Sequence, residues 1–260
     1  MGNRNILLII VSLGILSSCS NSNLEEKGFP VVNTTADENI DDGKAEGINK
    51  DSLIFETRPS SVLLTGVSNI RLATVYKVNL NKKHGTTFIG SNNFLYNDSE
   101  QEQGNNWNGH LMPGLEGVYG YNLVNVSLYD FQTNTRREFF DKPVLIKTVY
   151  YPAFSNDTLN NSLVKRNYIF TSVYDDDTNK DGFINAKDLR RFYLFNINGE
   201  RQSALVPENY SVFKSEYDEG NDVMFVFARL DKNANGQIED SEPVTIFWIN
   251  LQDPTKTMQL

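Results

Sequence analysis

From about Leu53 onward, the chain is a series of short apolar runs separated by polar turns. The runs are rich in Val, Ile, Phe and Tyr, and Asn, Gly, Asp and Pro cluster between them. Apolar and polar positions alternate with the two-residue period of half-buried strands, and no long stretch has the helical period. The sequence therefore predicts a single all-β domain over residues 53–260.

Four of the predicted strands end in the same way. In each one an aromatic or aliphatic run reaches an Asp or Asn, which is followed by one hydrophobic residue and a polar turn. The segments are Tyr76–Asn81, Ser127–Phe131, Tyr193–Ile197 and Phe247–Leu251. Their Asp or Asn positions lie 51, 66 and 54 residues apart, a spacing typical of propeller-like arrays. We therefore expect four propeller-like β-repeats, and a β-sandwich with two similar hairpins is the alternative.

Two twelve-residue stretches occupy equivalent places in the last two repeats. Residues 177–188 read DTNKDGFINAKD and residues 231–242 read DKNANGQIEDSE, 54 positions further on without a gap. Both have oxygen-bearing side chains at positions 1, 3, 5, 9 and 12, with Gly at position 6 and Ile at position 8. This pattern resembles the calcium loop of EF-hands, in which these oxygens and the carbonyl of position 7 surround one ion.

The resemblance implies two Ca²⁺ sites with the same set of ligands. The expected ligands are Asp177, Asn179, Asp181, the carbonyl of Phe183, Asn185 and Asp188 in the first loop, and Asp231, Asn233, Asn235, the carbonyl of Gln237, Glu239 and Glu242 in the second. The alternative for each loop is a solvated hairpin turn rich in Asn, Asp and Gly.

The flanks of the two loops differ from those of an EF-hand. Residues 168–174 and 223–227 before the loops, and 192–197 and 244–251 after them, have the composition of strands. The loops therefore resemble the calcium hairpins of integrin-type propellers, with at most one helical turn at residues 186–190. A sensor EF-hand works by reorienting two helices. Without such helices, we expect calcium to stabilise the hairpins rather than to act as a switch.

The N-terminus has the pattern of an export signal. Arg4 precedes an apolar stretch from Ile6 to Leu16, which at 1.5 Å per residue is too short for a hydrocarbon core of ~30 Å. Leu16-Ser17-Ser18-Cys19 follows, and Cys19 is the only cysteine of the chain. This sequence resembles the lipobox of bacterial lipoproteins, so we expect a signal peptide over residues 1–18 and a lipid on Cys19. The polar composition of residues 19–52 predicts a flexible tether.

Charge and motif content narrow the expected function. The formal net charge is −9, which disfavours nucleic acid and anionic lipid as partners. The sequence contains no zinc-binding spacing, nucleophile elbow or glycine-rich phosphate loop. The mature chain resembles bacterial lipoproteins with calcium loops, which implies a non-enzymatic binding or structural module held in the outer membrane by its lipid, facing the periplasm or the cell surface. Its partner would be an envelope protein or a glycan. The alternative function is a glycan-directed hydrolase of the cell envelope.

Overall fold

The computed structural model describes Leu24 and residues 26–31, 55–95 and 112–260. The predicted signal peptide (residues 1–18), Cys19 and most of the predicted tether (residues 19–52) lie outside the described residues, so the predictions about them stay predictions. The described residues are all-β, and no helix long and apolar enough to cross a membrane is found among them. The predicted helical turn at residues 186–190 is a bend and turn without a helix.

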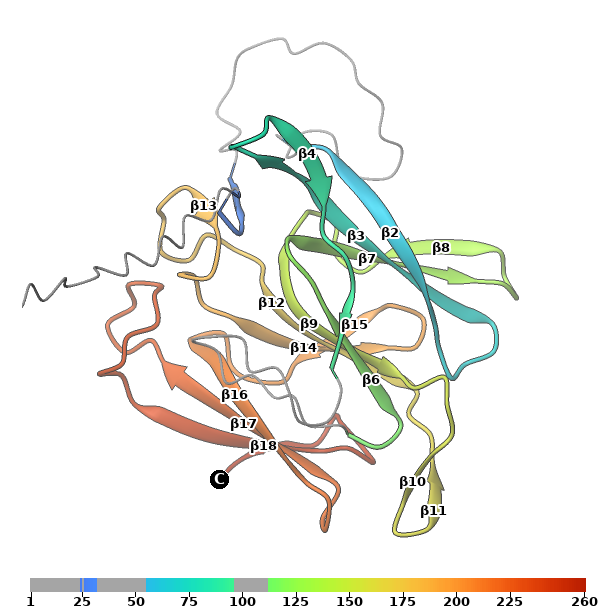
Figure 1. Cartoon of the computed structure of the whole chain (residues 1–260). Coiled ribbons are helices and arrows are strands. Elements are labelled where there is room, and N and C mark those ends of the chain that lie inside the picture. Colours follow the sequence, from blue (N-terminus) through green and yellow to red (C-terminus); the bar gives the residue numbers. More distant parts are fainter. Residues whose placement is uncertain (1–23, 25, 32–54, 96–111) are drawn as a thin grey trace, which may run out of the picture.

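Most of the described strands belong to three antiparallel sheets (Figure 1). The strands of the first two sheets interleave along the chain, and the third sheet follows them. The first sheet contains β2 (Thr57–Leu64), β3 (Ile70–Asn81), β7 (Leu123–Asp130) and β8 (Thr135–Glu138), with β4 (Thr86–Ile89) paired to β3. The middle sheet has the order β15 (Arg201–Ala204), β14 (Arg191–Asn196), β12 (Tyr168–Tyr174), β9 (Leu145–Pro152), β6 (Leu115–Tyr119) and β5 (Asn93–Phe94). The third sheet contains β16 (Tyr210–Asp218), β17 (Val223–Leu230), β18 (Val244–Asn250) and β19 (Thr257–Gln259).

Two short strand pairs complete the described structure. β10 (Asp157–Leu159) pairs with β11 (Ser162–Val164), and β1 (Phe29–Pro30) pairs with β13 (Phe183–Ile184). The second pair joins the N-terminal segment to the loop between β12 and β14, more than 150 residues further along the chain.

The central strands of the middle sheet are buried on both faces because this sheet packs between the other two. Side chains of the first interface come from the first and middle sheets and include Leu72, Val126, Ile146, Ile169 and Phe195. Side chains of the second interface come from the middle and third sheets and include Phe170, Leu194, Val226, Phe247 and Ile249. Successive residues of a strand point to opposite faces. Every residue of β12 is therefore buried, on one interface or the other.

The four similar segments lie in three sheets rather than four. Tyr76–Asn81 ends β3 and Ser127–Phe131 overlaps β7, and these two strands are antiparallel neighbours in the first sheet. The third and fourth segments coincide with β14 and β18, which occupy different sheets. The first two segments are therefore not equivalent strands of separate repeats. The last two segments lie in different sheets and can be equivalent strands of separate repeats.

Part of the predicted flexible tether is bound to the domain. Leu24 forms a β-bridge with Asn81, and the Gly28 N–H donates to Asn122 Oδ1 over 2.8 Å. The side chain of Phe29 is buried, and its ring lies 4.8 Å from that of Phe55. Apolar burial and strand pairing offset the cost of ordering these residues. The prediction of a flexible tether is therefore wrong for residues 26–31.

Candidate metal centre

Both predicted loops lie between strands, as their flanks indicate. The first loop, residues 177–188, connects β12 to β14 and carries the short strand β13 within it. The second loop, residues 231–242, connects β17 to β18. β12 covers the residues predicted for it, and the other three flanking strands differ from prediction by three residues or fewer at each end. The structure therefore presents each loop on two hydrogen-bonded antiparallel neighbours of one sheet.

The carboxylate at position 1 organises each loop in the same way. In the first loop, Asp177 accepts hydrogen bonds from the N–H groups of Asp181 (3.0 Å) and Gly182 (2.9 Å). In the second loop, Asp231 accepts from the equivalent N–H groups of Asn235 (3.1 Å) and Gly236 (2.9 Å). The side chain at position 1 thus lies inside each loop, where the backbone turns around it.

The carboxylate at position 12 closes each loop from the other side. Asp188 is fully buried and accepts from the N–H groups of Thr178 (2.9 Å) and Asn185 (2.8 Å), at positions 2 and 9. Glu242 accepts from Lys232 (3.0 Å) and Glu239 (3.2 Å), the same two positions of the second loop.

Burial raises the pKa of the Asp188 carboxyl above its ordinary value, although backbone N–H groups lower it and so oppose part of that effect. A cation held in the loop would offset the cost of burying this charge.

At positions 3 and 5 of both loops, the side-chain oxygen accepts a hydrogen bond from the backbone N–H two residues further on. Asn179 Oδ1 accepts from Asp181 N–H and Asp181 Oδ1 accepts from Phe183 N–H, each over 3.0 Å. In the second loop Asn233 Oδ1 accepts from Asn235 N–H, and Asn235 Oδ1 accepts from Gln237 N–H. Position 9 differs between the loops. The Glu239 carboxylate accepts from the amides of Asn233 and Asn235, whereas Asn185 Oδ1 accepts from the Lys187 N–H.

The donor set fits a hard cation better than a soft metal. The described residues contain no cluster of three or more His, Cys, Asp or Glu side chains close enough to hold a metal ion. The predicted ligands of each loop instead combine carboxylates with amide oxygens and one backbone carbonyl. Oxygens of these three kinds are the ligands that Ca²⁺ uses, and soft metals prefer sulfur or imidazole.

The two loops contact each other directly, which the sequence alone did not predict. Thr178 Oγ1 donates to the carbonyl of Gly236 over 2.6 Å, and the Leu189 N–H donates to the same hydroxyl. Thr178 is position 2 of the first loop, and its backbone N–H bonds Asp188 at position 12. Position 6 of the second loop is thereby linked through one threonine to the closing carboxylate of the first.

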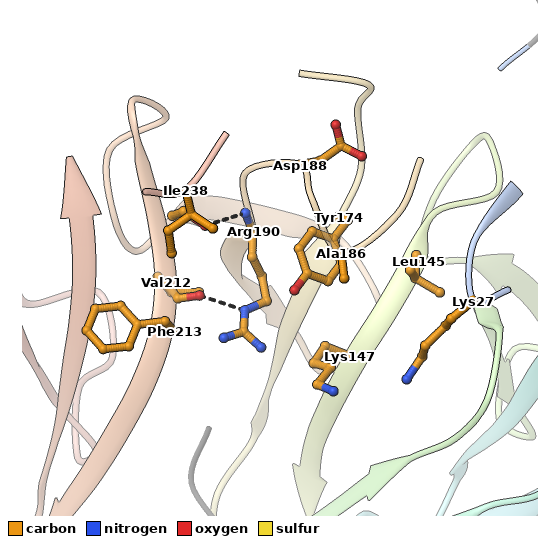
Figure 2. A pocket seen from close by; sticks show the side chains of 11 residues that line it. Lys27, Leu145, Lys147, Tyr174, Ala186, Asp188, Arg190, Val212, Phe213 and Ile238 are labelled. Carbon is orange, nitrogen blue, oxygen red and sulfur yellow. Dashed lines mark hydrogen bonds between the residues drawn. The ribbon is translucent and has the colours of Figure 1, made fainter. Parts of the chain in front are cut away.

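A cavity of about 240 Å³ lies beside the two loops, and sequence reasoning missed the residues that line it. Three of them are the basic residues Lys27, Lys147 and Arg190 (Figure 2). Among the described residues that line the cavity, Asp188 is the one carboxylate. A signal was present in the sequence, because Lys147 interrupts the otherwise apolar run from Val144 to Ala153 together with only Thr148.

Comparison of the chain with protein-family models matches no family, and no curated protein is similar to it in sequence.

Proposed function

We propose that the protein is a lipid-anchored lipoprotein of the bacterial envelope that binds one Ca²⁺ in each of its two loops. Calcium acts as a structural stabiliser, and the domain serves as a non-enzymatic binding or structural module. The observation that carries the proposal is the repetition of one hydrogen-bond arrangement in both loops. In each loop, position 1 accepts from positions 5 and 6, and position 12 accepts from positions 2 and 9.

A turn that only needed to reverse the chain would not require this arrangement twice. Two-residue turns connect antiparallel strands without long loops. Twelve-residue loops with inward carboxylates cost conformational entropy and place negative charges close together. Calcium would offset both costs, because it orders the loop and neutralises the carboxylates. No paired helices flank the loops, which favours stabilisation over signalling.

For the architecture, we propose that the second and third of the large sheets are propeller-like repeats. Each contains a central strand that leads into a twelve-residue loop and a returning strand with an Asn at equivalent positions, Asn196 and Asn250. Three sheets pack face to face in succession, with the middle one between the other two, which supports a propeller-like array more than a two-sheet sandwich.

Calcium should raise the thermal stability of the protein, and a chelator should lower it. For modules of this kind a Kd of roughly 10⁻⁴–10⁻³ M is expected. Calcium at a hundredfold excess over the Kd would stabilise the fold by about 2.7 kcal/mol per site. Thermal unfolding in calcium, magnesium and chelator measures this effect, and isothermal titration should give two sites. Identical unfolding curves in calcium and in chelator would rule out the proposal.

Substitutions that remove single carboxylates test the first loop specifically. Asp181→Ala removes a predicted ligand at position 5, whereas Asp176→Ala removes an exposed carboxylate immediately before the loop. Asp181→Ala should weaken one of the two sites by tenfold or more, and Asp176→Ala should leave both nearly unchanged. Equal weakening by the two substitutions would mean that general negative charge attracts the ion, without a site in the loop.

The first loop should also control the N-terminal segment. Val31 N–H donates to the Gly182 carbonyl over 2.8 Å, and β1 pairs with β13 inside the loop. If calcium orders the loop, it protects the peptide bond after Lys27 from trypsin. We therefore expect cleavage at Lys27 to become at least several-fold faster in chelator than in calcium, measured by mass spectrometry over time. Cleavage after the exposed Lys82, which lies in the turn after β3, serves as the internal control and should not change.

A further inference from the structure

We propose that the outer face of the third sheet, turned away from the middle sheet, docks on the same face of a second copy of this chain. The inner face of the third sheet packs on the middle sheet through Met224, Val226 and Ala228 of β17. Successive residues of a strand point to opposite faces, so Phe225 and Phe227 point outward. Both of these side chains are partly exposed.

The cross-strand register extends the apolar surface over the neighbouring strands. Phe225 lies opposite Trp248 of β18, and Trp248 lies opposite Met258 of β19. Phe227 lies opposite Ile246 in the same way. Opposite residues of antiparallel strands share a face of the sheet. The outer face therefore contains the apolar side chains of Phe225, Phe227, Ile246, Trp248 and Met258, with the exposed Val244 at one end.

The first sheet, at the opposite end of the stack, has a different outer face (Figure 1). Its inner side chains, such as Leu72 of β3 and Val126 of β7, are apolar. Its outward-facing side chains include Arg71 of β3, Ser127 of β7 and Arg136 of β8, and Arg136 Nε donates to Ser127 Oγ over 2.8 Å. An apolar outer face is thus not general to this fold. Soluble proteins rarely leave a contiguous apolar patch of several hundred Å² in water, so this one points to a partner.

The charged side chains on the outer face of the third sheet are balanced within one copy. Lys214 forms an ion pair with Glu216, and its Nζ lies 4.7 Å from the centre of the Phe227 ring. Arg229 Nη2 lies 3.1 Å from Asp240 Oδ1. The chain has a net charge of −9, so two copies repel each other overall. A face with balanced charges allows a second copy to approach with little of that repulsion.

The composition of the face favours a protein over a glycan as its occupant. Ligand sites fix the orientation of a small molecule with a few precisely placed polar side chains, and the charged side chains of this face are already paired. Aromatic residues and Met are enriched in protein interfaces, and Met258 and Ile246 lie beside the aromatic rings. A second copy supplies an identical sheet face. The docked sheets would continue the face-to-face packing that the three sheets of one chain already show.

The size of the face predicts a weak dimer. β16, β17 and β18 contain 9, 8 and 7 residues, and β19 adds a short fourth strand. At about 3.3 Å per residue and about 4.8 Å between strands, the face covers roughly 500 Å². Two facing copies would bury roughly 1,000 Å², which is near the lower limit for a specific interface. We therefore expect a dissociation constant in roughly the micromolar range.

Sedimentation velocity over about two decades of protein concentration tests the proposal. The sample is the chain from residue 19 with Cys19→Ser, which keeps every described residue and lacks the predicted signal peptide and lipid. A reversible monomer–dimer equilibrium is expected. Val244→Lys should raise its dissociation constant tenfold or more, because the interface would bury an unpaired charge. Val62→Lys is the matched control and should leave the equilibrium unchanged. Val62 is a similarly exposed valine, 63% against 49% for Val244, on the outer face of the first sheet.

General charge effects are the same in the two variants, since each adds one positive charge to an acidic chain. A chain that stays monomeric at every concentration would overturn the proposal, and so would equal weakening by Val62→Lys and Val244→Lys. Flotation with phosphatidylcholine vesicles identifies a different occupant. If the chain is monomeric and binds vesicles through this face, so that Val244→Lys abolishes flotation, the occupant is a lipid surface and not a second copy. If Val244→Lys fails to fold, Met258→Lys on the exposed strand β19 gives the same test.

Discussion

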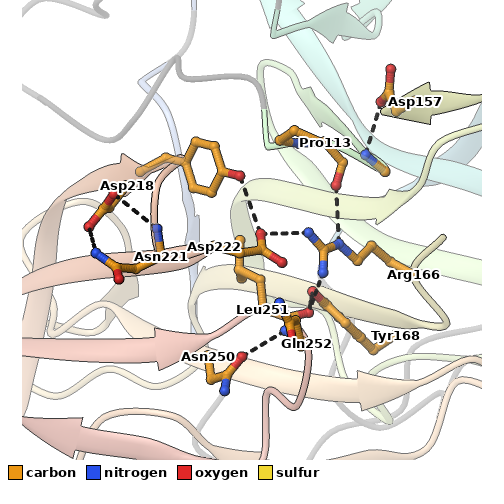
Figure 3. A network of polar contacts seen from close by, with 12 residues as sticks. Pro113, Asp157, Arg166, Tyr168, Asp218, Asn221, Asp222, Asn250, Leu251 and Gln252 are labelled. Carbon is orange, nitrogen blue, oxygen red and sulfur yellow. Dashed lines mark hydrogen bonds and ion pairs between the residues drawn. The ribbon is translucent and has the colours of Figure 1, made fainter. Parts of the chain in front are cut away.

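Replacing Asp222 with asparagine should destabilise the domain by about 3 kcal/mol, because the substitution leaves a buried guanidinium without its counter-charge. Asp222 lies between β16 and β17 of the third sheet, and Arg166 lies between β11 and β12 at the middle sheet. Arg166 Nη2 and Asp222 Oδ1 are 2.7 Å apart, and both side chains are about 95% buried (Figure 3). The ion pair therefore joins two sheets within the protein interior.

Arg166 makes further hydrogen bonds that another side chain in its place would not form. Arg166 Nη1 donates to the Leu251 carbonyl (2.7 Å) and Nε to the Pro113 carbonyl (3.1 Å). Tyr168 donates to the Leu251 carbonyl as well, over 2.7 Å. The hydroxyl of Tyr217 donates to Asp222 Oδ1 over 3.2 Å. The bonds from Arg166 and Tyr217 both go to Asp222 Oδ1. The amide oxygen of an asparagine of nearly the same shape can accept both, so the expected loss arises mainly from the missing charge.

Urea unfolding of three variants separates the ion pair from its surroundings. Asp218→Asn is the matched control, because Asp218 makes hydrogen bonds only at the exposed end of the same hairpin, to Gly220 and Asn221. It should change the midpoint little. Arg166→Met combined with Asp222→Asn should cost less than the sum of the two single substitutions, since the double variant buries no unpaired charge. If the costs of Arg166→Met and Asp222→Asn add up in the double variant, or if Asp218→Asn costs as much as Asp222→Asn, the ion pair is not the source of the stability.

The local features of this fold were predictable from sequence because they depend on nearby residues. The flanking strands, the strand–loop–strand form and the sharp turns at Gly182 and Gly236 all follow from patterns within about 20 residues. Both glycines have positive φ, +87° and +73°, as position 6 of such a loop requires. The sequence also predicted an all-β domain, and the described residues confirm it.

Long-range features escaped prediction because no local pattern encodes them. The similarity of the segments ending β3 and β7 suggested separate repeats, but strand texture alone does not reveal that these strands pair with each other. The contact of Thr178 with Gly236 joins residues 58 positions apart, and the bond of Arg166 to Asp222 joins residues 56 apart. The polar composition of the N-terminal segment concealed one apolar anchor, Phe29. Burial of this side chain against the first loop is sufficient to hold the segment on the domain.

Replacing Gly236 with alanine should destabilise the protein by about 3 kcal/mol, and Gly182→Ala by only about 1 kcal/mol. Both glycines occupy position 6 of a loop with positive φ, so both substitutions introduce the same kind of backbone strain. Their surroundings differ. A Cβ at Gly182 would meet nothing within 4 Å, whereas a Cβ at Gly236 would lie 1.9 Å from the carbonyl oxygen of Thr178. Backbone atoms cannot rotate away, so the two loops would have to separate.

Separation of the loops should weaken calcium binding in the loop that carries no substitution. Gly236→Ala breaks the hydrogen bond from Thr178 Oγ1, and Thr178 in turn holds Asp188, the expected ligand at position 12 of the first loop. The amide signal of Gly182, whose N–H donates to Asp177, reports on the first loop during a calcium titration followed by NMR. In Gly236→Ala this signal should reach its midpoint at a calcium concentration several-fold higher than in the unaltered protein. An unchanged midpoint would mean that the two loops bind their ions independently, despite the contact between them.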